Sequence, residues 1–302
     1  MGIFDIFKDK PQEPILYKDE KDLTFKEGVY VFENCENVIL SGTAKVLEST
    51  NTSYSLVNGR SKIQIFNSGK IKEISGKAKI GIIKNGEILK VCGKSEITTI
   101  NNCKIEYVSG KAKIGTLNCG EIEFVDGNCE IGTIKQGKIK FLRNKAKIGT
   151  LINGEISGIL DKSKITTVMN GNISFVLNNS IIGTLNNGKV EELCDESEIL
   201  TQNDGIVEYM MGTSVICSQI NGACKKMSGE STVKYSSQKE NNFLPKLHKV
   251  EEVIVQTEIK PKNIKKDIKK SKNKNLENIN TKTETLENAD EKENESDNKK
   301  EE

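Results

Sequence analysis

The sequence predicts an all-β protein: a three-sided parallel β-helix, or β-solenoid, of 17-residue coils, followed by a disordered C-terminal tail. Three observations lead to this fold class. A 17-residue period runs through most of the chain. The apolar columns of this period are β-branched, and its recurring glycines mark corners. Only 35% of the residues are hydrophobic and 5% are aromatic, which is too little for a wide globular core.

The period is free of gaps over residues 76–143, which hold four consecutive coils. Further copies extend it in both directions, starting at Gly42 and Gly59 before this region and at Asn144, Asp161, Asn178, Asp195, Gly212 and, in part, Gly229 after it. Residues 25–41 form a degenerate first coil. About eleven full coils at a strand spacing of about 4.8 Å predict a rod on the order of 50 Å long.

Numbering each coil from its first residue separates the inward columns from the outward ones. Position 5 is always Ile or Val, position 3 is always small, and positions 13 and 16 are aliphatic or Met in most coils. Position 8 is apolar from Phe66 to Leu185 and then becomes Gln202 and Gln219. These columns predict a thin aliphatic interior made of strands. We expect the two glutamines to weaken the core of the last coils.

Three positions of the coil carry conformationally permissive residues. Position 1 is Gly, Asn or Asp, the residues that tolerate a positive φ. Position 11 is Gly in most coils, and position 6 is often Gly, as in Gly81 and Gly115. Three such points per coil predict three short strands per coil.

The charged residues support stacked parallel coils. Lys and Glu alternate along position 12 from Lys70 to Glu155 and along position 4 from Lys79 to Lys147. Stacking would bring equivalent residues about 4.8 Å apart. Alternation therefore places opposite charges next to each other along both columns, which favours pairs between neighbouring strands.

Residues 1–24 precede the period. Ile3, Phe4 and Phe7 would share one face of a short helix before Pro11, so this segment is a candidate anchor for a weak membrane-surface contact. The alternative interpretation is that it caps the open end of the solenoid. The solenoid itself is assigned to residues 25–240.

Residues 241–302 lack the period and are rich in Lys, Glu and Asn, which predicts a disordered charged tail. The tail is basic over 260–274 and acidic over 284–302. Its basic block is either a solvated segment or a candidate contact for an acidic partner or another polyanion, through Lys262, Lys265, Lys266, Lys269 and Lys270. Sequence-specific nucleic-acid recognition is not expected, because no aromatic residues are interleaved with the lysines.

The sequence does not predict an enzyme. The single histidine, His248, is far from any cysteine cluster, and no phosphate-binding loop, nucleophile elbow or zinc motif is present. We therefore expect no catalytic residues, no metal and no cofactor. The eight cysteines contain no Cys-x-x-Cys pair and fit reduced thiols, and no signal-peptide or membrane-spanning pattern occurs, so a cytoplasmic location is expected.

One outward column is a candidate interaction surface. Position 15 is polar in several coils but aromatic in five of them: Tyr107, Phe124, Phe141, Phe175 and Tyr209. Five aromatic side chains along one edge would form a partly apolar stripe. The alternative is that they only cover the backbone between positions 13 and 16.

The coils resemble those of bactofilins, in segments such as Ala-Lys-Ile-Gly-Thr-Leu at 112–117 and Gly-Glu-Ile-Glu-Phe-Val at 120–125. The resemblance covers residues 25–240. It implies a bacterial, polymer-forming cytoskeletal protein with a β-helical core, which self-associates in the cytoplasm and is peripheral to the inner face of the membrane. The alternative is a phage fibre or surface adhesin whose β-helix binds a glycan or a receptor.

Overall fold

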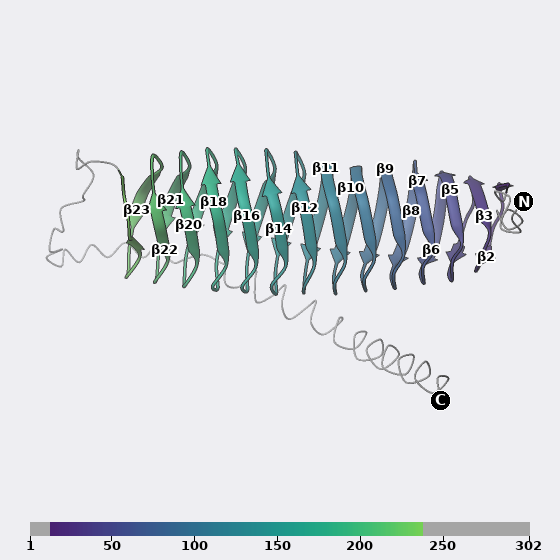
Figure 1. Ribbon diagram of the computed structural model, residues 1–302, viewed down its shortest axis with the longest axis horizontal. Coiled ribbons are helices and arrows are strands. Elements are labelled where there is room, and N and C mark those ends of the chain that lie inside the picture. The colour runs from purple at the N-terminus through teal and green to yellow at the C-terminus, as the bar shows by residue number, and fades with distance from the viewer. Residues whose placement is uncertain (1–12, 238–302) are drawn as a thin grey trace, which may run out of the picture. The chain divides into compact units, whose positions relative to one another are not determined.

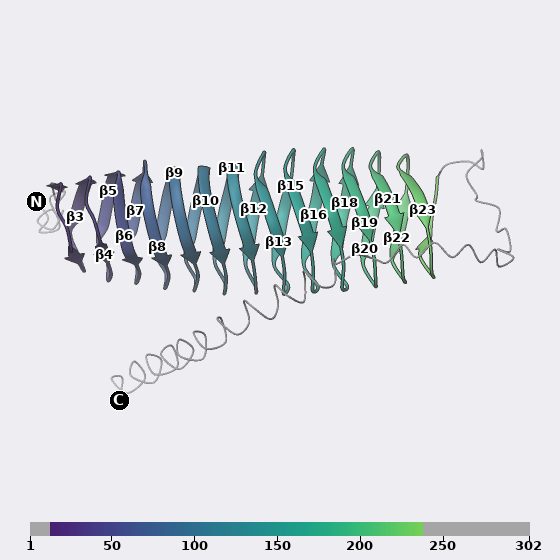
Figure 2. The ribbon, with the colours of Figure 1, turned by 180° about the vertical axis from the view of Figure 1, so that it is seen from behind.

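The computed structural model describes residues 13–237, which form a parallel β-solenoid and contain no helix. About thirteen coils stack in chain order along one axis (Figure 1), and the reverse view shows the same order (Figure 2). Each strand pairs in parallel with the equivalent strand one coil away. The predicted fold class is confirmed.

The N-terminal coils contain β1 (Ile15–Lys18), β2 (Thr24–Phe25), β3 (Val29–Glu33), β4 (Val38–Leu40), β5 (Lys45–Thr50), β6 (Thr52–Val57), β7 (Lys62–Phe66) and β8 (Gly69–Ile74). Three long strands follow, β9 (Lys79–Val91), β10 (Glu96–Val108) and β11 (Lys113–Val125). The next coils contain β12 (Glu130–Ile134), β13 (Lys138–Leu142), β14 (Lys147–Leu151), β15 (Glu155–Ile159), β16 (Lys164–Met169) and β17 (Asn172–Val176). The last ones contain β18 (Ile181–Asn186), β19 (Lys189–Leu193), β20 (Glu198–Gln202), β21 (Ile206–Met210), β22 (Val215–Gln219), β23 (Ala223–Met227) and β24 (Thr232–Val233).

The described coils have two strands each rather than the three short strands per coil that the sequence predicted. From β12 onward the strands cover about positions 4–8 and 12–16, and in β9, β10 and β11 the two run together. Position 6 lies inside the first strand rather than at a corner. A Cβ atom at Gly81 would lie 2.5 Å from the carbonyl oxygen of Gln64, and one at Gly115 would lie equally close to that of Thr98. Glycine is therefore needed there because adjacent coils approach closely.

Position 1 is a true corner, as predicted. Gly76 and Gly93 have φ values of 65° and 67°. Asn144 and Asp161 adopt 54° and 56° at the same position of later coils. This left-handed conformation is open to Gly without strain and is tolerated best by Asn and Asp among the other residues, which explains why the column contains only these residue types.

The solenoid starts earlier than the predicted boundary at residue 25. Strand β1 pairs with β3 with Ile15 opposite Tyr30, an offset of fifteen residues rather than seventeen. Register shifts between Tyr30 and Val31, and between Val38 and Ile39, bring the following coils to the regular length. The first coil was missed because its length differs from the period.

Aromatic side chains fill the interior of these irregular coils. The ring of Phe25 lies 4.3 Å from that of Tyr30, 5.0 Å from that of Tyr17 and 5.3 Å from that of Phe32, measured between centroids. Beyond Phe66 the core becomes aliphatic, with Ile, Val, Leu or Met at positions 5, 13 and 16 almost fully buried through the middle coils. Aromatic rings thus fill the interior where the coils are shorter and less regular.

The two glutamines near the C-terminal end differ in burial, since Gln202 is buried and Gln219 is only half-buried. Gln202 is fully buried, and its Nε2 donates to the carbonyl oxygens of Gly205 (2.7 Å) and Ala223 (3.0 Å). Gln219 Nε2 donates to the carbonyl oxygen of Gly222 (2.8 Å) and to Gln202 Oε1 (3.3 Å). Because the Nε2 groups of both glutamines are hydrogen-bonded, the last coils accommodate these polar side chains. That the glutamines weaken the core of the last coils stays a prediction.

Candidate interaction surfaces

Four members of the aromatic stripe predicted at position 15 lie next to one another over five coils, one of which contributes Gly158, and the fifth member is separate. Tyr107 in β10 stacks on Phe124 in β11 with ring centroids 5.1 Å apart, and Phe124 stacks on Phe141 in β13 at 5.8 Å. Phe175 in β17 lies 6.2 Å from Phe141. Tyr209 in β21 is separated from Phe175 by one coil, in which Glu192 is the paired residue.

A missing side chain allows Phe175 to reach Phe141 across an intervening coil. Gly158 in β15 pairs with Phe141 on one side and with Phe175 on the other. A Cβ atom at Gly158 would lie 2.3 Å from the ring of Phe175. The Phe175 ring therefore fills the space above this glycine and continues the row.

Charged side chains pack against one side of the stripe. The Arg143 guanidinium carbon lies 4.7 Å from the Phe124 ring centroid, and its Nη2 lies 2.9 Å from Asp126 Oδ2. Phe124 is buried, with 8% of its surface exposed. Burial, followed by the nearby Glu106 and Glu123, raises the pKa of the Tyr107 hydroxyl above its usual value, so this group is neutral at physiological pH.

The stacking limits what the stripe can bind. Aromatic rings bind sugars through their faces, but Phe124 is stacked on both sides by Tyr107 and Phe141. Mainly the edges of the rings are exposed to solvent, and the charged Arg143 and Asp126 lie beside them. Stacking energy along the row stabilises the solenoid, which favours the structural interpretation of the stripe over that of a ligand platform.

The predicted charge columns form ion pairs between neighbouring coils. Lys79 Nζ lies 2.6 Å from Glu96 Oε2, and Lys113 Nζ lies 2.9 Å from Glu130 Oε2 along position 4. Along position 12, Lys70 pairs with Glu87 and Lys138 pairs with Glu155, both at 2.9 Å. The lysines at these pairs hold the pKa of Glu87 and Glu130 below the usual value. The alternation predicted from the sequence is confirmed at these four pairs.

The two ends of the described solenoid expose apolar side chains. At the N-terminal end, Ile15 and Leu16 of β1 are 51% and 57% exposed. At the C-terminal end, Ile220, Met227 and Tyr235 are 41%, 43% and 69% exposed. Met227 belongs to the inward column of position 16, and it is exposed because no regular coil follows within residues 13–237. The sequence offered a signal for these sites, namely that the period stops there.

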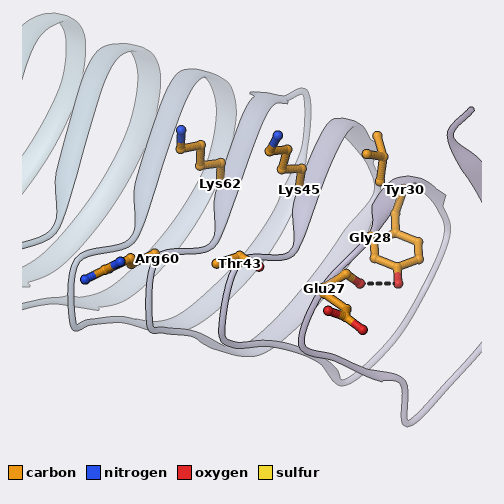
Figure 3. A pocket seen from close by; sticks show the side chains of 8 residues that line it. Glu27, Gly28, Tyr30, Thr43, Lys45, Arg60 and Lys62 are labelled. Carbon is orange, nitrogen blue, oxygen red and sulfur yellow. Dashed lines mark hydrogen bonds between the residues drawn. The ribbon is translucent and has the colours of Figure 1, made fainter. Parts of the chain in front are cut away.

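A depression near the N-terminal end collects basic side chains (Figure 3). Lys45 and Lys62 line it from the first strands of adjacent coils, and Arg60 and Thr43 lie at the turns before these strands. Figure 3 shows Arg60 pointing away from the two lysines. The lysines are neighbours in register, so the alternation of charge along position 4 does not extend to this end.

Burial controls the accessibility and the protonation state of several cysteine thiols. Cys35, Cys103, Cys129 and Cys194 are buried, and Cys119 is exposed, and none of these five forms a disulfide. Burial raises the pKa of Cys103 and Cys129 to about 12 and that of Cys194 to about 11. These three are therefore protonated at physiological pH and are packed as small apolar groups.

Two sets of predicted residues lie outside the described part of the chain. They are the candidate membrane contact of Ile3, Phe4 and Phe7 and the candidate polyanion contact of Lys262, Lys265, Lys266, Lys269 and Lys270. Within residues 13–237, no group of three His, Cys, Asp or Glu side chains is arranged to hold a metal ion. No helix in that range has the length and apolarity to cross a membrane.

Comparison with known proteins was made at three levels, and none gave an assignment. No protein-family model matches the chain, and neither a curated protein nor a solved structure matches it significantly.

Proposed function

We propose that the protein is a non-enzymatic, bactofilin-like structural protein that polymerises by stacking the C-terminal end of one solenoid on the N-terminal end of the next. The observation that carries this proposal is the exposure of apolar side chains on edge strands at both ends of the described solenoid, Leu16 at one end and Met227 at the other. A parallel β-solenoid is compatible with a structural or scaffold role.

End-to-end stacking would repeat the pairing that already joins the coils. Within residues 13–237, β1 pairs only with β3, and β23 pairs only with β21. Each of these strands therefore has one edge of backbone groups available for a parallel partner. A head-to-tail contact leaves the same two ends free on the product, so it propagates into a filament rather than closing at a dimer.

The alternative of a fibre or adhesin that binds glycans has less support. Its best candidate surface would be the aromatic stripe, and the faces of the central ring there are occupied by neighbouring rings. We also propose a cytoplasmic location for the polymer. Its support is the set of buried cysteines that remain thiols, such as Cys103 and Cys129.

Electron microscopy and light scattering of the purified full-length chain test the proposal. We expect thin, unbranched filaments whose mass grows with concentration across the micromolar range. Leu16→Lys or Met227→Lys should shorten or abolish the filaments, because a charge would be buried at the junction. The matched control is Leu89→Lys, since Leu89 is 44% exposed and lies on the side of the solenoid in β9.

Two results would overturn the proposal. One is a full-length chain that stays monomeric over this concentration range at near-physiological salt. The other is assembly that responds equally to the end variants and to the Leu89 variant, because the contact would then not lie at the ends.

A further inference from the structure

A third charged column differs from the two that alternate in sign. Position 2 of the coil carries only cations among its charged residues from Arg60 to Lys162. All of these side chains are exposed, and none of them forms an ion pair in the structure, whose description includes this whole region. The members are Arg60, Lys77, Lys94 and Lys111 in four successive coils, then Lys145 and Lys162 after a neutral Asn128. We call the first four the basic ridge.

The turn backbone holds the basic ridge in register. The amide nitrogens of Arg60, Lys77, Lys94 and Lys111 donate to the carbonyl oxygen at position 1 of the preceding coil, at 2.6, 2.8, 2.8 and 2.9 Å. Neighbouring Cα atoms are thus about 4.8 Å apart, the spacing of strands in a sheet. Lys145 and Lys162 have positive φ values and a different turn, so they are not included in the ridge.

Folding does not explain the basic ridge. Like charges on adjacent strands destabilise a sheet, and this column stacks four of them. Over the same four coils position 12 alternates Lys with Glu, and position 4 stacks only Lys62 on Lys79 before it alternates. The two residues that precede each ridge cation are uncharged, with glycine at position 1 and Asn58, Ser75, Cys92 or Ser109 at position 17. A row of cations without ion pairs, with the Ser75 and Ser109 hydroxyl groups close in sequence, is chemically suited to phosphate oxygens, which accept hydrogen bonds from Lys, Arg and Ser.

We propose that the basic ridge binds the phosphate backbone of nucleic acid without reading its sequence. The ridge presents one cation about every 4.8 Å along a straight line. A nucleic-acid strand presents one phosphate about every 3.4 Å of rise, so the two linear charge densities are similar. The cations form a single row at the turns rather than a patch spread over a face, which fits a linear polyanion better than a flat anionic membrane. The ridge contains no aromatic residue that could stack on a base, so we expect it to contact only the sugar-phosphate backbone of the nucleic acid.

The test compares two triple variants of the full-length chain that change the net charge equally. The ridge variant is Lys77→Gln, Lys94→Gln and Lys111→Gln. The control variant is Lys70→Gln, Lys104→Gln and Lys138→Gln, in the column where lysines alternate with glutamates. Binding of a fluorescein-labelled duplex DNA is measured by anisotropy as a function of salt. In parallel, co-sedimentation measures binding to vesicles of phosphatidylcholine containing phosphatidylglycerol.

We expect the ridge variant to lower the slope of log K against log salt by about 2 to 3, since each phosphate contact contributes about 0.9. The control variant should change the slope by less than about 1. Replacing the three ridge lysines by Arg should retain wild-type binding, which shows that charge at these positions is what matters. Circular dichroism verifies that all variants are folded.

Three outcomes would overturn the proposal. The first is that the wild-type chain does not bind DNA at low salt. The second is that both triple variants lose affinity equally, since binding would then follow net charge or the lysines of 260–274. The third is that the ridge variant loses vesicle binding and keeps DNA binding, which would assign the ridge to a membrane surface.

Discussion

Individual side chains of a coil face two very different environments, although they are only a few residues apart. Ile131 at position 5 is 1% exposed and contacts the aliphatic column, whereas Lys138 at position 12 extends into solvent and pairs with Glu155 at 2.9 Å. The interior around Ile131 is aliphatic, with Ile114 and Ile148 at the same position of the adjacent coils, so a new charge there would have no polar partner beside it.

Ile131→Asp should therefore destabilise the protein by more than about 3 kcal/mol, because it buries a carboxylate without a partner. Lys138→Ala should leave the free energy of unfolding nearly unchanged, since solvent-exposed ion pairs contribute little. Urea denaturation of the two variants, followed by circular dichroism, measures both effects. Similar losses from the two substitutions would contradict the inward and outward assignment of the columns.

Cysteine reactivity gives a second prediction for single residues. Burial raises the pKa of Cys103 and Cys129 to about 12, so almost no thiolate forms at pH 8 and these thiols are also inaccessible. Cys119, at an exposed position of β11, should be alkylated first in the native protein. Mass spectrometry of peptides after brief treatment with iodoacetamide measures the order. Early labelling of Cys103 would show that the β10 region opens.

Strands β10, β11 and β13 are linked through the aromatic stripe as well as through their backbones. Phe124→Ala removes two ring contacts and the packing of Arg143 on the ring, and we expect a loss of about 2–4 kcal/mol. Tyr209→Ala is the control, because Tyr209 is 42% exposed and contacts no other aromatic ring within residues 13–237. Its loss should be under about 1 kcal/mol. Thermal and urea unfolding provide the measurement. Equal losses would mean that stacking does not stabilise the stripe.

The sequence predicted the strands of the regular coils well, because each column repeats one physical requirement many times. Position 5 shows β-branched burial and position 1 shows positive φ, and both are confirmed in the structure. The count of strands per coil was wrong because glycine has two uses. At Gly81 and Gly115 it accommodates the close carbonyl of the preceding coil, and a sequence pattern does not distinguish this from a turn.

The first coil and the hydrogen bonds of the C-terminal glutamines were not predicted from the sequence. Strand β1 pairs with an offset of fifteen residues, so a search at a fixed period passes over it. Gln202 looks like a defect in an apolar column, and only the coordinates show that its amide reaches two carbonyl oxygens. The aromatic stripe was found, but that its rings stack face to face depends on geometry that the residue types alone do not fix.

For the whole molecule, we expect that removing residues 241–302 leaves the solenoid folded. Within residues 13–237 the hydrophobic core extends from Tyr30 to Ile216, and each coil contacts its own neighbours. The truncated and full-length chains should have the same β-type circular dichroism spectrum and melt within a few degrees of each other. A fall of many degrees on truncation would show that the tail stabilises the solenoid.

Because the ion pairs alternate in sign, odd and even coils of the solenoid are not equivalent. The backbone repeats with every coil, but the charge pattern repeats only with every second coil. Deleting residues 93–109 would keep the backbone register and place Lys79 next to Lys113 and Glu87 next to Glu121. Deleting 93–126 removes twice as much, yet it places Lys79 next to Glu130 and Glu87 next to Lys138.

Both deletion variants should fold, but only the variant that lacks one coil, 93–109, should have a stability that depends strongly on salt. Raising the ionic strength screens repulsion between like charges, so the melting temperature of the chain lacking 93–109 should rise with salt. That of the chain lacking 93–126 should stay flat or fall slightly, as in the parent protein. Identical salt profiles for the two would show that the columns do not select their neighbours. If the profiles differ as expected, coils must be added to or removed from this region in pairs. Only then does the solenoid keep its stability at low salt.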